Sequence, residues 1–122
     1  MARYRTGRLG EEIKKSISKF LVSEAGDKRL TSRIISISGV DVTRDGSYAT
    51  CYVSPLLLDG EDKDVAYKEV IDALNHAKGV MRTKVAHDVN IRHTPELIFK
   101  IDESAEYGRH IDSIIRDLEQ GK

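Results

Sequence analysis

The sequence has few of the residues that build disulfide-rich or aromatic-rich proteins. Its 122 residues include one cysteine, Cys51, together with two prolines, two phenylalanines and no tryptophan. A single cysteine excludes an internal disulfide and is typical of a reducing compartment. The first residues lack the apolar core of a secretory signal, and no run approaches the ~20 apolar residues that a membrane span requires. We therefore expect a cytoplasmic protein that makes no contact with membranes.

The sequence also lacks the common signatures of catalysis and of metal binding. It contains no phosphate-binding glycine loop and no dinucleotide-binding glycine pattern, and its four histidines do not have the spacing of a zinc site. Cys51 shares one strand face with Ala49 and Val53, and these small apolar residues alternate with polar or aromatic ones, so we expect a small buried core residue there and not a nucleophile. No nucleophile, base and orienting group share a local pattern. We expect no enzymatic activity, no metal or other cofactor and no small-molecule substrate.

Charge is sorted along the chain although the net charge is zero, with 20 basic and 20 acidic residues. Residues 1–33 hold nine basic and four acidic residues, and residues 34–74 hold three and eight. Residues 75–100 hold five and two, and residues 101–122 hold three and six. If the fold brings the two basic blocks together, the molecule has a basic face. A solvated mosaic surface explains the same counts without any ligand.

Hydrophobic periodicity predicts a single α+β domain over residues 1–122, in the order helix, strand, strand, bent helix, strand, helix. The strands should form one three-stranded sheet with the helices packed on one face. Residues 1–8 should form a flexible basic arm. The expected helices at the two ends cover about 9–23 and 104–120. The expected strands cover about 32–43, 47–54 and 89–101, and the last should be interrupted at Pro95, which cannot donate to a ladder.

Two local features refine the predicted strands. Val40 and Val42 have the opposite parity to Ile35 and Ile37, so we expect a bulge at Ser38-Gly39 that restores the phase. The Asp45-Gly46 pair that follows is typical of a hairpin turn, because glycine readily adopts a positive φ.

The segment from Lys63 to His87 reads as one long amphipathic helix with a weak point at its centre. Its apolar stripe stays in phase over Tyr67, Val70, Leu74, Ala77, Met81 and Val85. Glycine costs about 1 kcal/mol relative to alanine inside a helix, so Ala77-Lys78-Gly79 predicts a bend. The bend could be a tolerated glycine in a core helix. It could also present backbone N–H groups, Lys78 and Arg82 to an anion.

The most specific pattern is this bent helix followed by a strand that contains a proline. The helix carries the Ala-x-Gly element Ala77-Lys78-Gly79, and the strand runs from Arg92 through Pro95-Glu96-Leu97 to Phe99. In order and spacing this pattern resembles the ribosome-binding factor A family, and the resemblance covers nearly the whole chain. It implies a type II KH-like fold, which is a nucleic-acid-binding fold.

The resemblance also implies a function. Members of this family are bacterial factors that bind the small ribosomal subunit and its 16S rRNA during late maturation. The expected role includes processing of the 5′ end of the 16S rRNA, dissociation before translation begins and adaptation to cold. The expected protein is a monomer when free. The alternative is a protein-interaction module that recruits another assembly protein without direct RNA contact.

Phosphate contacts require Lys or Arg side chains or helix N-termini, and the two basic blocks provide them. Reversing Lys78 and Arg82 to Glu is expected to weaken subunit binding without lowering thermal stability. The residues that we expect to contact RNA are Arg3, Arg5, Arg8, Lys14 and Lys15 in the first block, and Ala77, Lys78, Gly79, Arg82, Lys84 and Arg92 in the second.

Overall fold

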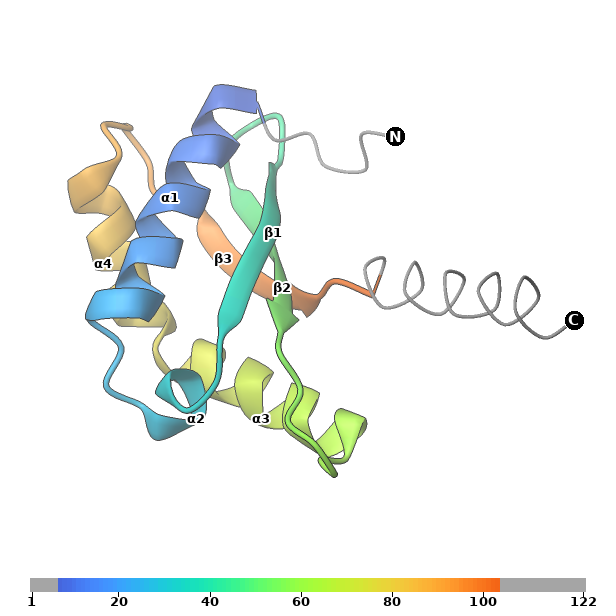
Figure 1. Ribbon diagram of the computed structural model, residues 1–122. Coiled ribbons are helices and arrows are strands. Elements are labelled where there is room, and N and C mark those ends of the chain that lie inside the picture. Colours follow the sequence, from blue (N-terminus) through green and yellow to red (C-terminus); the bar gives the residue numbers. More distant parts are fainter. Residues whose placement is uncertain (1–6, 104–122) are drawn as a thin grey trace, which may run out of the picture.

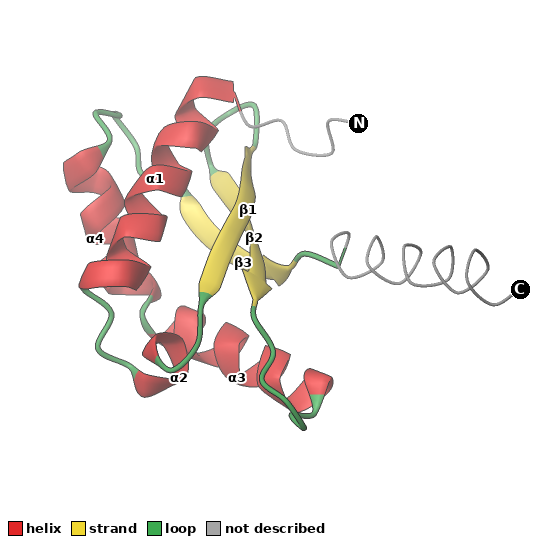
Figure 2. Cartoon of the chain, viewed as in Figure 1, coloured by secondary structure: helices red, strands yellow, loops and turns green. Residues whose placement is uncertain are grey.

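The computed structural model describes residues 7–103 and contains one three-stranded sheet with helices against it (Figures 1 and 2). Arg3, Arg5 and the expected C-terminal helix lie outside the described residues. In chain order the elements are α1 (Gly7–Ser23), α2 (Lys28–Thr31), β1 (Ile35–Val42), β2 (Tyr48–Pro55), α3 (Lys63–His76), α4 (Lys78–Asp88) and β3 (Glu96–Ile101). The predicted α+β architecture is confirmed.

The sheet has the strand order β1-β2-β3 and mixed pairing. β1 pairs antiparallel with β2 through a tight turn, in which Gly46 has a φ of +77° as the sequence predicts. The pairing register shifts between Ile37 and Gly39, which confirms the bulge. β2 pairs in parallel with β3, because α3 and α4 carry the chain back to the starting end of β2.

One apolar core lies between the sheet and the helices. α1 and α4 lie side by side against one face of the sheet, and α3 crosses its end (Figure 1). The inward residues of β2 are fully buried: Ala49, Cys51 and Val53. Burial raises the pKa of the Cys51 thiol to about 12, so this side chain remains a protonated core residue, as predicted.

The structure corrects two predicted boundaries. α1 begins at Gly7, so Arg8 is helical and does not belong to an arm. β3 begins at Glu96, whose N–H donates to the Ser47 carbonyl at 2.8 Å, and residues 89–95 form a loop. The prediction of a strand from Val89 was wrong, because Pro95 has no N–H with which to continue a ladder.

The short helix α2 was not predicted. Four residues are too few to show a hydrophobic period. Its start is fixed by Asp27, whose carboxylate accepts from the Arg29 N–H at 2.9 Å and pairs with the Arg29 guanidinium at 2.7 Å. These bonds lower the pKa of Asp27 to about 2.

Candidate nucleic-acid interface

The predicted bend is a break between two helices. α3 ends at His76 and α4 begins at Lys78, with Ala77 between them at φ −89° and ψ 4°. Ala77 still donates to the Ala73 carbonyl, and its own carbonyl accepts from Met81, both at 3.0 Å. Among residues 7–103, no side chain caps the start of α4. The first turn of a helix has N–H groups without helical acceptors, so the start of α4 carries partial positive charge, while the last carbonyls of α3 at the same break carry partial negative charge. Ala77 and Lys78 are half-buried there.

Gly79 lies in the first turn of α4 and is exposed. Its φ is not positive, and a methyl group added there would meet no heavy atom within 4 Å. Neither the backbone conformation nor packing within the described residues requires glycine. The open space lies beside the uncapped helix start and the half-buried Lys78, where the backbone of a ligand could approach closely. We call Ala77, Lys78 and Gly79 the α3–α4 junction.

Arg82, one turn further along α4, donates hydrogen bonds to backbone carbonyls of the fold. Its Nε donates to the Pro95 carbonyl at 3.1 Å, and its Nη2 donates to the Thr94 carbonyl at 2.7 Å. The guanidinium therefore holds the loop that leads into β3. The expectation that its reversal to Glu leaves stability unchanged needs correction, because that change removes both bonds.

Lys84 is also engaged within the fold. Its Nζ lies 2.7 Å from a carboxylate oxygen of Glu24 and 3.8 Å from one of Asp88, and only 19% of the side chain is exposed. The Glu24 contact is the main cause of the raised pKa of Lys84. Lys84 ties the end of α1 to α4 and is a poor candidate for contact with phosphate.

An open groove of about 670 Å³ separates α1 from the C-terminal end of α4. It is floored by Ser16, whose hydroxyl donates to Asp88 at 3.0 Å. Three cations and three carboxylates line it, and Arg8 pairs with Glu12 at 3.3 Å. The lining residues are Arg8, Glu11, Glu12, Lys15, Ser16, Lys19, Asp88 and Val89.

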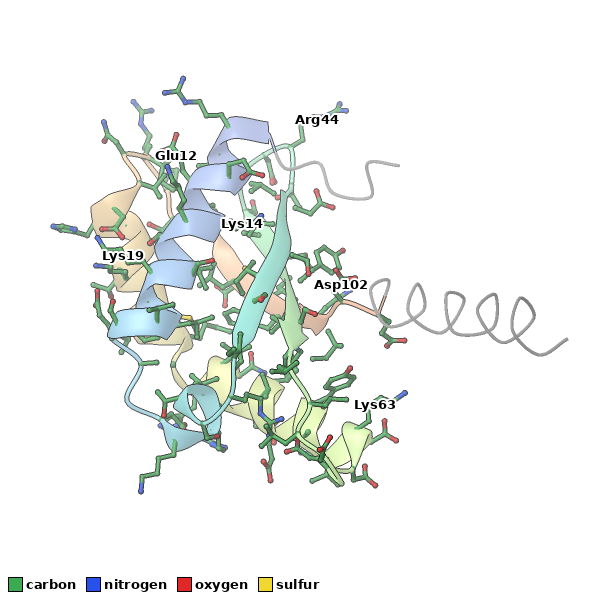
Figure 3. The ribbon with its side chains drawn as sticks, in the orientation of Figure 1. Glu12, Lys14, Lys19, Arg44, Lys63 and Asp102 are labelled. Atoms are coloured by element: carbon green, nitrogen blue, oxygen red, sulfur yellow. The ribbon has the colours of Figure 1, made fainter. Side chains whose placement is uncertain are left out.

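Two groove cations, Lys15 and Lys19, form no ion pair with any residue between 7 and 103, and both are exposed. Lys19 was missed by the sequence analysis, although its spacing of four from Lys15 places the two on one helix face. Figure 3 shows Lys19 on the α4 side of α1, whereas Lys14 lies on the β1 side. The predicted pair Lys14 and Lys15 therefore does not act on one surface.

The candidate cations lie at opposite ends of α4, with Lys78 at its start and Lys15, Lys19 and Arg92 near its C-terminal end. The contacts Ser16–Asp88 and Glu24–Lys84 show that α1 and α4 run antiparallel, so the groove lies at the C-terminal end of α4. The 11 residues of α4 separate this end from the junction by about 16 Å. Arg92 is exposed in the loop after α4. The described cations thus form two separate sites.

Neither a membrane span nor a metal cluster is found in the part of the chain that the structure describes. No helix within residues 7–103 is both long and apolar enough to cross a bilayer. No three His, Cys, Asp or Glu side chains in the same range could together hold a metal ion.

The comparisons with a family model and with curated proteins identify the same family. A family model described as ribosome-binding factor A matches residues 5–115. Ribosome-binding factor A of Clostridium beijerinckii is 43% identical over 99% of this chain and 98% of its own length. The Clostridium tetani protein of the same name is 40% identical over the full chain and 96% of its own length.

Solved structures give the same result. A Thermotoga maritima structure described as a putative ribosome binding factor A is 30% identical and has a TM-score of 0.66, covering 84% of this chain and 93% of its own. The Thermus thermophilus crystal structure of ribosome-binding factor A has a TM-score of 0.62 at 22% identity, covering 80% and 97%. These structures have a KH-like fold, so the predicted fold class is confirmed.

Proposed function

The chain belongs to the ribosome-binding factor A family, and on this premise we propose that it binds the small ribosomal subunit as an assembly factor. A homology model of Thermus thermophilus ribosome binding factor A, described as fitted into a cryo-EM map of its complex with 30S, has a TM-score of 0.60 at 21% identity and covers 80% of this chain and 96% of its own. The observation in this chain that carries the proposal is the α3–α4 junction. There, a helix start without a side-chain cap lies beside Lys78 and beside Gly79, which has open space around it.

The junction has the chemistry of a phosphate site. The N–H groups at the start of α4 and the Lys78 ammonium group can both approach a phosphate oxygen, and Gly79 offers no side chain to obstruct the RNA backbone. Lys15, Lys19 and Arg92 offer further phosphate contacts about 16 Å away at the other end of α4. Aromatic side chains are few, so recognition rests on RNA shape and backbone and not on stacking.

The finer role follows the family. We propose that the protein binds 16S rRNA within the small subunit during late maturation, supports processing of the 5′ end of the rRNA, and dissociates before translation. It acts in the cytoplasm as a monomer, contributes to growth in the cold, and works by binding alone, without catalysis, cofactor or small-molecule substrate. Arg3 and Arg5 add phosphate contacts from the N-terminal segment.

The first experiment is co-sedimentation of the purified protein with small subunits, with large subunits and with free RNA over a series of salt concentrations. Selective binding to small subunits, weakening steeply as salt rises, is the expected result. Selective binding that is insensitive to salt would point to a protein partner on the subunit. Equal binding to all three, or none, would contradict the proposal.

Charge-reversal variants then locate the contact. Lys78→Glu is expected to weaken binding to small subunits, as are Lys15→Glu and Lys19→Glu to a smaller extent. Lys68→Glu is the matched control, because Lys68 is exposed on α3 and, among residues 7–103, forms an ion pair with Asp72 alone, at 2.9 Å. If Lys68→Glu weakens binding as much as Lys78→Glu, the effect is general charge and the junction is not the contact.

A further inference from the structure

The sheet has a second face that no described helix covers. α1 and α4 pack against the inner face, and the outer face looks away from them (Figure 1). By strand alternation this outer face carries Tyr48, Thr50, Tyr52 and Ser54 of β2 with Glu96, Ile98 and Lys100 of β3. Ile98, Tyr48 and Tyr52 give this face more apolar surface than is typical of a sheet face that contacts only water.

One end of the outer face is a hollow with apolar walls. Ile34 and Leu56 are paired there through the Leu56 N–H and the Ile34 carbonyl at 2.8 Å, and their side chains are 67% and 53% exposed. The hollow measures about 530 Å³ and adds Ser36, Ser54, Pro55 and Leu57. We call it the end groove. Large exposed apolar side chains gathered in a hollow are typical of a surface that another segment covers.

The chain leaves the sheet beside this groove. The Asp102 N–H donates to the Val53 carbonyl at 2.8 Å, and Val53 precedes Ser54 of the groove. Strands lie about 5 Å apart, so Ser54 is one strand from the exit and Ser36, its partner on β1, is two. Asp102 is only 7% exposed, so packing holds the chain in place where it leaves the sheet (Figure 3).

The residues that follow have the pattern of a partner for this surface. Residues 104–122 contain one apolar stripe with helical spacing, at Tyr107, Ile111, Ile114, Ile115 and Leu118, and polar residues elsewhere. A 17-residue helix over 104–120 would be about 25 Å long. The eight-residue strand β2 is about 26 Å long, so the lengths match.

We infer that residues 104–122 fold back as an amphipathic helix and pack their apolar stripe on the outer face, beginning at the end groove. The covalent connection at residue 103 favours this occupant over a second copy, because the tethered segment is always present at a high effective concentration. The sheet then has a helical layer on both faces. This inference does not depend on the proposed ribosomal function.

The test uses a spin label on the full chain. Ser54→Cys places a nitroxide at the end groove, and the fully buried Cys51 does not compete for the label. We expect the label to attenuate the amide NMR signals of residues 107–118 several-fold. A label at Thr50→Cys checks that the first label does not itself block the groove, and one at Lys15→Cys on α1 should leave those signals unchanged.

Two further samples identify the occupant. Ile115→Asp should abolish the attenuation, whereas Ser113→Asp, which adds the same charge away from the stripe, should keep it. Mixing labelled protein with isotope-enriched unlabelled protein should give no attenuation. Attenuation in the mixture would assign the face to a second copy, and unattenuated signals from both outer-face labels would leave it uncovered. Either result would overturn the inference.

Discussion

Replacing Gly79 by alanine should separate the effect of this residue on stability from its effect on binding to small subunits. The added methyl group meets no heavy atom of the described part of the chain within 4 Å, and the backbone there has no positive φ. Alanine is favoured over glycine in helices by about 0.5–1 kcal/mol. The free energy of unfolding should therefore rise by about this amount, which corresponds to an increase of about 2–5 °C in the melting temperature.

The same methyl group fills the open space beside the start of α4. If an RNA backbone approaches there, Gly79→Ala should weaken binding to small subunits by about tenfold, or roughly 1.4 kcal/mol. Gly26→Ala is the matched control, since Gly26 is also exposed, has no positive φ and has equally open surroundings.

Thermal denaturation and subunit binding are measured on the same preparations. A variant that is more stable and binds more weakly supports a contact at the junction. A variant that is more stable and binds like the wild type would show that Gly79 lies outside the contact. A less stable variant would refute the packing argument itself.

Three further predictions concern the fold. Arg82→Met should lower the free energy of unfolding in urea by about 2 kcal/mol, because two carbonyls lose a charged donor; an unchanged value would contradict the role assigned to Arg82. Arg33 holds the pKa of Glu61 at about 2, below its ordinary 4.5, so the stability advantage over Glu61→Gln should be complete above pH 4.5 and disappear as the pH falls towards 2; an advantage that persists at pH 2 would be inconsistent with this pair. Cys51 should resist thiol reagents at pH 8 until the protein unfolds, and rapid labelling of the native protein would contradict its burial.

Local backbone features were predictable from the sequence because their causes are local. The bulge at Ser38-Gly39 follows from a break in strand parity, and the hairpin from Asp45-Gly46. The break at Ala77 was predicted from the low helix propensity of Gly79 at the centre of a continuous apolar pattern, although the backbone of Gly79 itself does not require glycine. The interruption at Pro95 was predicted because proline cannot donate to a ladder, but residues 89–94 were wrongly assigned to the strand, which begins only after the proline.

The sequence could not predict which cations are exposed to a ligand and which form contacts within the fold. Arg82 is engaged by backbone carbonyls, which leave no mark in the sequence, and Lys84 by Glu24, which lies 60 positions away. Charge counts treat these residues like Lys78. Only the packing of α4 against α1 and the loop before β3 distinguishes an engaged cation from an exposed one.

The most direct test of the account is the salt dependence of the dissociation constant for small subunits, compared between wild type, Lys78→Glu and Lys68→Glu. If Lys78 contacts a phosphate, its reversal should weaken binding and reduce the slope of log K against log salt by about 0.7–0.9, while Lys68→Glu leaves the slope unchanged. Equal slopes for all three proteins would show that the junction makes no phosphate contact, and would contradict the central claim.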